Sequence, residues 1–213
     1  MMKRVMLLLL AVVSFAFTAT AGDKDKKKKA DTDKKSATTA ASTTNDKEIN
    51  WMTLDDVQAA MRKEPRKVLV DFYTSWCGWC KVMDRKTYSN PEIIKYINEK
   101  FYAVKFDAER KDTVSFLNKE YGFNPQKRAN EFAVLLIGEN LSYPTTVFLM
   151  ENFQTPSALP GFQDVPKMEM ILKYLGENTY KSTQFPEYQK AFVPTFKVLP
   201  EPQMSPGAQP AAH

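Results

Sequence analysis

The feature that most constrains the fold is a stretch in which an apolar run leads directly into two closely spaced cysteines. Val68 to Phe72 reads as a buried strand, and residues 77–86 can wind as a helix. The chain's only two cysteines, Cys77 and Cys80, lie three residues apart where that helix would begin. A thiol at a helix start is close to unpaired backbone N–H groups and to the positive end of the helix dipole, which both stabilise a thiolate. Cys80, one turn on, is close enough to attack a mixed disulfide formed at Cys77, so the stretch predicts a redox-active dithiol.

Other roles for the cysteine pair fit the sequence less well. A structural disulfide is disfavoured because a bridge that closes so short a loop restricts the unfolded chain very little. A structural zinc site needs about four ligands, whereas the chain offers two thiols and a single histidine, His213. The same scarcity of histidine excludes a protease or transferase in which histidine activates the cysteine. A catalytic dithiol without metal or other cofactor is the favoured interpretation.

Further motifs accompany the cysteines at the strand before them, at a proline loop and near the end of the domain: Val70-Asp71-Phe72 before Trp76-Cys77-Gly78, Tyr143-Pro144-Thr145 before the apolar run Thr146 to Met150, and Gly161-Phe162 before the helix-like run Lys167 to Leu175. Together these motifs resemble the thioredoxin superfamily, over residues 49–180. The resemblance implies an α/β thioredoxin fold, with a central mixed β-sheet flanked by helices. One departure lies inside the motif, at Trp79, where thioredoxin carries proline.

The resemblance implies an acid–base pair behind the thiols. Asp71 would be buried behind Cys80, with a raised pKa, and would take the Cys80 proton through a water. Lys105 matches the position of the family's lysine beside that acid. The alternatives are an Asp71 turned to solvent at the strand end and a Lys105 that is an ordinary surface lysine.

The resemblance also implies a substrate-binding edge beside Cys77. Pro144 is expected to be cis, so that the Tyr143 carbonyl and the Thr145 amide could pair with a substrate strand; a trans proline in a plain turn is the alternative. The two tryptophans would add apolar surface beside the thiols. The residues expected to contact substrate are Trp76, Gly78, Trp79, Tyr143, Pro144 and Thr145.

The residues between the cysteines favour one direction of electron flow. Gly78 and Trp79 supply no histidine or cation to stabilise the thiolate beyond the helix start. A thiol pKa of about 7 is therefore favoured over the very low values of strong oxidants, and this favours a reductant. The sequence predicts a thiol–disulfide oxidoreductase that acts on protein disulfides and thiols and is recharged by a membrane electron donor. A disulfide oxidase or isomerase, or a binding or redox-sensing module without turnover, are the alternatives.

The N-terminal residues predict the compartment. Residues 1–21 read as a signal peptide, with Lys3 and Arg4 followed by a 13-residue apolar core from Val5 to Phe17 and a small-residue cleavage site, Ala19-Thr-Ala21. Thirteen residues are too few to span a bilayer comfortably. Cleavage without a stable membrane anchor is therefore expected, and with it a periplasmic or secreted protein, since disulfides persist there.

Low-complexity segments flank the expected domain. Residues 22–48 form a charged and Ser/Thr-rich linker without large apolar residues, and residues 181–213 form a proline-rich extension with disorder expected beyond Thr195. Of the formal charge of +5, Lys3 and Arg4 supply +2, and the linker supplies +2 through eight lysines against six acids. About +1 remains for the rest, so the charge is no sign of nucleic-acid binding. A monomer is expected.

Patterning between these ends predicts alternating helices and strands. The 36 residues between Asp107 and Pro144 exceed what a minimal thioredoxin uses, and we expect an elaborated insertion there. Its loop Tyr121 to Arg128 would lie near the rim of the active site, either as a surface insertion without function or as a partner-selecting loop. The expected elements are a helix capped by Thr53, strand Lys67 to Phe72, helix Cys77 to Lys86, a helix from Pro91, strand Phe101 to Phe106, helix Lys111 to Tyr121, helix Ala129 to Ile137, strands Thr146 to Met150 and Leu159 to Gln163, and helix Val165 to Leu175.

Overall fold

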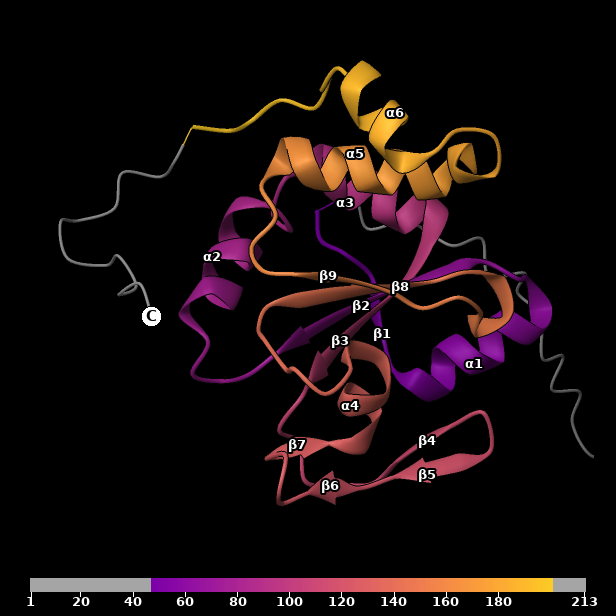
Figure 1. Ribbon diagram of the computed structural model, residues 1–213, viewed down its shortest axis with the longest axis vertical. Helices are drawn as coiled ribbons and strands as arrows, with labels where there is room; N and C mark the ends of the chain where they lie inside the picture. The colour runs from indigo at the N-terminus through magenta and orange to yellow at the C-terminus, as the bar shows by residue number, and fades with distance from the viewer. Residues whose placement is uncertain (1–46, 201–213) are drawn as a thin grey trace, which may run out of the picture. The chain divides into compact units, whose positions relative to one another are not determined.

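The computed structural model describes residues 47–200 (Figure 1). The expected signal peptide (1–21), nearly all of the expected linker (22–48) and the last part of the extension (201–213) lie outside the described residues. Within residues 47–200, no helix has both the length and the apolar character that crossing a membrane requires.

A five-stranded mixed sheet forms the centre of the domain, with strand order β1-β3-β2-β8-β9. The central strand β2 pairs in parallel with β3 and antiparallel with β8, which in turn pairs antiparallel with β9. This arrangement confirms the central mixed sheet and the parallel pair expected from the sequence. The strands are β1 (Trp51–Met52), β2 (Lys67–Tyr73), β3 (Phe101–Asp107), β8 (Thr145–Leu149) and β9 (Ser157–Pro160).

Helices cover both faces of this sheet (Figure 1). Side chains of α2, α3 and α5 share one buried core, and those of α1 and α4 share the other. Thr53, Asn90 and Asp164 cap three of the helices through side-chain oxygens that accept backbone N–H groups. The helices are α1 (Leu54–Lys63), α2 (Gly78–Lys86), α3 (Pro91–Lys100), α4 (Glu131–Ile137), α5 (Val165–Gly176) and α6 (Phe185–Ala191), with short 3-10 turns η1 (Glu151–Phe153) and η2 (Thr179–Lys181).

Alternation along β2 determines which residues reach which core. Val68, Val70 and Phe72 lie in the core shared with α1 and α4, whereas Leu69 lies in the core shared with α3 and α5. Successive side chains of a strand point to opposite faces. Asp71 therefore follows Leu69 onto the face covered by α2, α3 and α5.

The insertion differs from its expected structure. The helix predicted over Lys111 to Tyr121 is wrong, because the segment forms an antiparallel hairpin of β4 (Val114–Phe116) and β5 (Lys119–Tyr121). Its buried residues alternate with exposed or half-buried ones, which is the period of a strand. Leu117 and Asn118 form the turn with positive φ angles of 51° and 62°, as a two-residue hairpin turn requires.

A second hairpin and a helix complete the insertion. β6 (Phe123–Asn124) pairs with β7 (Ala129–Asn130), and α4 follows at once. The helix expected over Ala129 to Ile137 is confirmed, except that its first two residues belong to β7.

Buried Asn130 fastens the insertion to the domain. Its backbone N–H donates to the Ala108 carbonyl at 2.7 Å, and its side-chain Nδ2 donates to the carbonyls of Asp112 and Tyr121 at 3.1 and 3.3 Å. Its Oδ1 accepts the Phe132 N–H at 3.0 Å, which caps α4. Four hydrogen bonds from one buried residue hold the β6–β7 turn at a defined place beside the sheet.

The last strand begins and ends earlier than expected. β9 covers Ser157–Pro160 rather than Leu159 to Gln163. Gly161 ends it with a φ of 82°, and its N–H donates to the Pro144 carbonyl at 2.8 Å. The glycine thus turns the chain out of the sheet toward α5.

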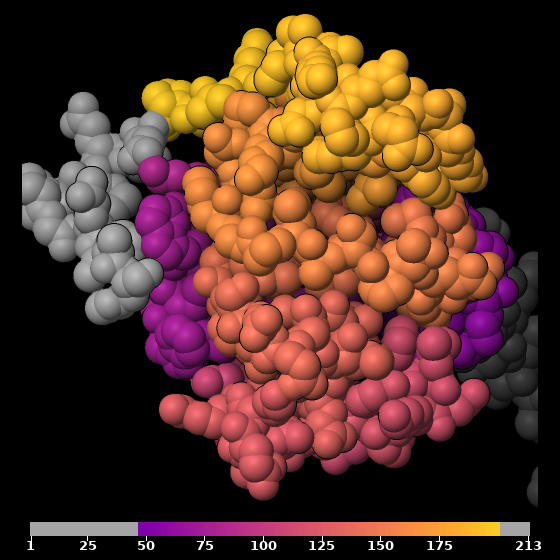
Figure 2. Space-filling model, viewed as in Figure 1, coloured from indigo at the N-terminus to yellow at the C-terminus, as the bar shows by residue number. Residues whose placement is uncertain are grey.

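The C-terminal extension is folded as far as it is described. Helix α6 lies beyond α5, and Figure 2 shows this part of the chain, in yellow, as the uppermost layer of the visible face. The backbone N–H groups of Thr195 and Phe196 donate to the buried Glu169 carboxylate at 3.0 Å. Disorder was expected beyond Thr195, whereas residues 195–197 contact α5 and α3 through Glu169 and Glu92.

Candidate active site

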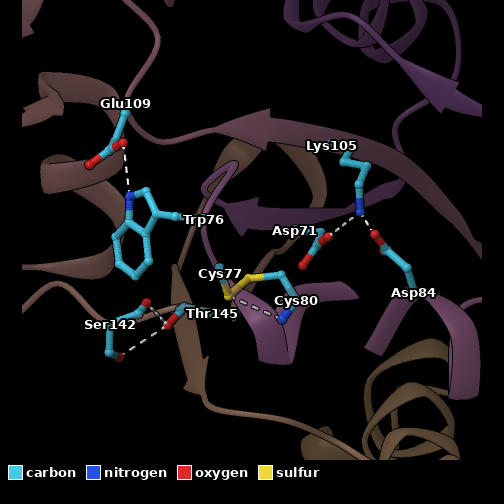
Figure 3. Close-up of a disulfide and its surroundings, with 9 residues drawn as sticks. All are labelled: Asp71, Trp76, Cys77, Cys80, Asp84, Lys105, Glu109, Ser142 and Thr145. Carbon is cyan, nitrogen blue, oxygen red and sulfur yellow. Dashed lines mark hydrogen bonds and ion pairs between the residues drawn. A yellow bond between two sulfur atoms is a disulfide. The ribbon is translucent and has the colours of Figure 1, made fainter. Parts of the chain in front are cut away.

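The two cysteines lie at the start of α2, which follows the carboxyl end of the central strand β2 after a short loop. Cys77 is the N-cap of α2, as the sequence predicted, and its Sγ accepts the Cys80 backbone N–H at 3.0 Å. The two sulfur atoms are joined in a disulfide (Figure 3). An amide N–H aimed at Cys77 Sγ would stabilise negative charge on that sulfur once the bridge is reduced.

A buried acid and a lysine lie behind the disulfide. The parallel register of β2 and β3 places Asp71 directly beside Lys105 on the same face of the sheet. Lys105 Nζ donates to Asp71 Oδ2 at 2.8 Å and to Asp84 Oδ1 at 2.6 Å (Figure 3). The side chains become more exposed along this chain, from 3% for Asp71 through 25% for Lys105 to 42% for Asp84. The ammonium therefore links a carboxylate in the interior to one at the surface.

The buried position of Asp71 controls its titration. Burial raises the pKa of Asp71, and the attraction of Lys105, which lowers it, is the smaller effect. Burial lowers the pKa of Lys105, but its two carboxylate partners outweigh this and leave the pKa raised. Asp71 Oδ1 is buried without a hydrogen-bond partner in residues 47–200, and Figure 3 shows it on the side that faces the cysteines. A buried carboxylate oxygen without a hydrogen-bond partner is able to accept a proton.

Aromatic rings enclose the lysine. Lys105 Nζ lies 5.2 Å from the ring centre of Trp51, 5.1 Å from that of Tyr73 and 5.7 Å from that of Tyr88. Such contacts favour the charged form of an amine that has lost part of its water. They also limit the positions that Lys105 can adopt, so that it stays beside Asp71.

An open groove of about 840 Å³ runs along the Cys77 side of the disulfide. Cys77 lines it and Cys80 does not. Trp76 and Trp79 are exposed at 64% and 44% despite their size, and Trp76 Nε1 donates to Glu109 Oε2 at 3.0 Å. The lining residues are Trp76, Cys77, Gly78, Trp79, Glu109, Lys127, Arg128, Leu141, Ser142 and Tyr143.

The proline loop forms part of the same groove. The Tyr143–Pro144 peptide bond is cis, as expected. The Tyr143 ring packs edge-on against Trp76, with ring centres 6.1 Å apart. Thr145, the first residue of β8, is fully buried, and its hydroxyl donates to the Ser142 carbonyl at 2.7 Å, so its side chain is not available to a substrate.

Sequence reasoning identified most of this cluster. Cys77, Cys80, Asp71 and Lys105 lie together, and Trp76, Gly78, Trp79 and Tyr143 share the groove with Cys77. Pro144 and Thr145 belong to the adjoining loop without lining the groove. The residues of this cluster and groove that the sequence did not single out are Asp84, Glu109, Lys127, Arg128, Leu141 and Ser142. Asp84 could have been found from its spacing, because it follows Cys80 by four residues and so lies on the same helix face.

No group of three or more His, Cys, Asp or Glu side chains in residues 47–200 is arranged to hold a metal ion. Between the Asp71 and Asp84 carboxylates lies the ammonium of Lys105, which forms an ion pair with each.

Comparison with known proteins gives a family match and several structural likenesses. The family model Thioredox_DsbH, described as "Protein of unknown function, DUF255", matches residues 32–171. A thioredoxin-fold protein from Helicobacter pylori is 20% identical over 60% of this chain and 81% of its own, with a TM-score of 0.46. A DsbH oxidoreductase is 14% identical over 61% and 85%, with a TM-score of 0.45. A thioredoxin from Thermus thermophilus is 18% identical over 63% and 89%, with a TM-score of 0.43. No curated protein matches the sequence.

Proposed function

The chain belongs to the DsbH-type family of the thioredoxin superfamily, and from this premise we propose that it is an extracytoplasmic thiol–disulfide oxidoreductase that reduces protein disulfides. The observation that carries the proposal is the asymmetry of the two cysteines. In the disulfide form both residues are nearly buried, at 3% and 4% exposure, but only Cys77 lines the open groove, and its Sγ accepts the N–H of Cys80 in the first turn of α2. One sulfur is thus placed to attack a substrate and the other to resolve the product.

The first half-reaction occurs in the groove. The Cys77 thiolate attacks one sulfur of a client disulfide, a new bond forms between Cys77 and that sulfur, and the other client sulfur leaves as a thiolate. The Cys80 N–H, 3.0 Å from Cys77 Sγ, supports the thiolate before attack. A client strand that pairs with the backbone of the Tyr143–Pro144–Thr145 loop would hold its sulfur beside Cys77.

The second half-reaction needs a base in the interior. Cys80 loses its proton to Asp71 through a water, and the Cys80 thiolate then attacks Cys77 Sγ. The bond to the client breaks, the second client sulfur leaves as a thiolate, and the Cys77–Cys80 disulfide forms. Two electrons have passed from the dithiol to the client. The buried Oδ1 of Asp71, which has no hydrogen-bond partner in the described part of the chain, is the proposed proton acceptor.

The oxidised enzyme must then be recharged. A reduced dithiol of a membrane electron donor would attack the Cys77–Cys80 disulfide and become oxidised, which returns two electrons to the pair. A reductant is favoured because the intervening residues Gly78 and Trp79 add no cation beside Cys77.

Reduction of insulin tests this function. With dithiothreitol as electron source, the purified protein should accelerate insulin precipitation, and Cys77→Ser should not. Equilibration with glutathione should give a reduction potential closer to that of thioredoxins, about −270 mV, than to that of the strong oxidant DsbA, about −120 mV. A potential near the oxidising value would show an oxidase or isomerase. No turnover with any disulfide would show a binding or redox-sensing module.

The extracytoplasmic location gives a separate expected result. The mature chain should begin near Gly22, because the small residues Ala19 and Ala21 follow a short apolar core. N-terminal sequencing or intact mass measurement of protein from the cell envelope or medium checks this. Material that still carries Met1 would mean a membrane-tethered protein instead.

A further inference from the structure

The insertion brings an arginine to the rim of the groove that holds Cys77. Arg128 lies in the β6–β7 turn and lines the groove together with Tyr143 and Trp76. Figure 2 shows the insertion along the lower part of the visible face. Because buried hydrogen bonds of Asn130 hold the turn in place, the fold of the domain also determines where Arg128 lies.

The backbone at Arg128 is in an unusual conformation. Its φ is 54°, in the left-handed region that favours glycine, and a non-glycine residue there costs free energy. The turn is otherwise supported, since the Lys127 N–H donates to Asn124 Oδ1 at 3.0 Å. A long cationic side chain is thus held at a position where a glycine would fit the backbone better.

The charge of Arg128 is not compensated within the described chain. Lys127, its neighbour in the groove, forms an ion pair with Glu139. Glu109 on another part of the lining accepts the Trp76 Nε1–H. Arg128 is exposed and makes no hydrogen bond or ion pair with any residue between 47 and 200. The groove therefore presents a guanidinium ready for a carboxylate, which it can bind through two parallel hydrogen bonds.

We propose that Arg128 is a specificity-determining residue that binds an acidic side chain of an extended client segment while a client cysteine lies beside Cys77; this rests on the proposed disulfide reduction. A protein segment is favoured because the open groove is lined by the exposed side chains of Trp76 and Trp79 and by Tyr143, which offer apolar surface to the side chains of an extended chain. A chain in that position could reach the insertion with a side chain near its cysteine.

Matched peptides test the proposal. Each carries a disulfide-bonded cysteine with Glu, Gln or Lys placed two residues away on both sides, and the second-order rate constant of reduction is measured at low and high salt. Arg128→Gly removes the guanidinium and suits the left-handed backbone. It should slow reduction of the Glu peptide by roughly fivefold, the order expected for a partly exposed charge pair. The Gln peptide should react at the same rate as with the wild type, and Arg128→Glu should favour the Lys peptide.

The matched control is Arg62→Glu. Arg62 is an exposed arginine near the end of α1, just before β2 begins, and so lies at the opposite end of the sheet from the thiols. The Arg62→Glu variant should reduce the Glu, Gln and Lys peptides at the same rates as the wild type. The Arg128 effect should shrink with added salt, because screening weakens exposed charge pairs.

The outcomes separate this proposal from the function on which it rests. Equal slowing of all three peptides by Arg128→Gly overturns the proposed recognition of acidic segments. So does a slowing that is seen only with a small acidic disulfide, glutathione disulfide, and not with the Glu peptide. In both cases uncharged hydroxyethyl disulfide would still be reduced, and the proposed function would stand. A wild-type protein that reduces neither the peptides nor hydroxyethyl disulfide overturns both.

Discussion

Cys80→Ser is expected to abolish turnover and to accumulate a stable mixed disulfide between Cys77 and its clients. Cys77 lines the groove and can still attack a client disulfide, but no second thiol remains to release the product. Serine has nearly the shape of cysteine, so the small volume around residue 80 should accommodate it. Non-reducing electrophoresis of the variant after incubation with oxidised client, followed by mass spectrometry of the adduct, measures the trapped species.

Cys77→Ser is the matched variant. It removes the sulfur of the cysteine that lines the groove and leaves Cys80, which does not line the groove, so it should trap no client. Equal capture by both single variants would contradict the assignment of attacking and resolving roles. Capture by Cys77→Ser alone would reverse it.

The part of the site that lies on regular strands and helices could be predicted from the sequence. A continuous apolar run before Cys77 leaves few alternatives to a buried strand followed by a helix, and the parallel pairing of β2 with β3 then places Lys105 beside Asp71. The strand and the helix depend on residue periodicity, which one sequence contains, whereas the pairing of Asp71 with Lys105 was implied by the resemblance to a family. The expectation that the bond before Pro144 is cis likewise came from the resemblance to a family.

The insertion and the extension show where such prediction fails. In residues 111–121 the apolar side chains suit one face of a helix and one face of a hairpin almost equally, and the turn at Leu117 and Asn118 decided between them. The order beyond Thr195 depends on the buried carboxylate of Glu169, 26 residues earlier in the chain. The role proposed for Arg128 likewise depends on groove residues that are distant in sequence, and no local pattern indicates such contacts.

Asp71→Asn is expected to stabilise the protein above acidic pH. Burial is the main cause of the raised pKa of Asp71, so ionising this carboxyl in the folded state costs free energy. A proton is therefore bound more tightly in the folded than in the unfolded state. Relative to the Asn variant, the wild type should lose stability as the pH rises from the unfolded value of about 4 through the raised folded value, by about 1.4 kcal/mol for each unit of pKa difference. The Asn variant should lack this loss, and the two proteins should converge at low pH.

Lys105 keeps a partner in this variant, because Asp84 Oδ1 lies 2.6 Å from its Nζ. The substitution therefore does not leave a half-buried ammonium without a carboxylate. Urea unfolding at a series of pH values gives the comparison directly. A difference between the two proteins of the opposite sign, with the wild type gaining stability relative to the Asn variant as the pH rises, would mean that the attraction of Lys105 outweighs burial.

The same substitution should slow the release of the client. Without Asp71, Cys80 has no buried proton acceptor, and the decay of the mixed disulfide at neutral pH should fall by roughly a hundredfold, the order typical of a lost general base. The first attack by Cys77 should change much less. Above about pH 9 the Cys80 thiol ionises without help, so the two decay rates should approach each other.

The control variant is Asp84→Asn, which removes the other carboxylate that Lys105 binds and should change the decay of the mixed disulfide only a few-fold. Stopped-flow measurements that follow formation and decay of the mixed species separately would show these differences. Unchanged decay in Asp71→Asn would mean that solvent deprotonates Cys80 and that Asp71 has a structural role alone.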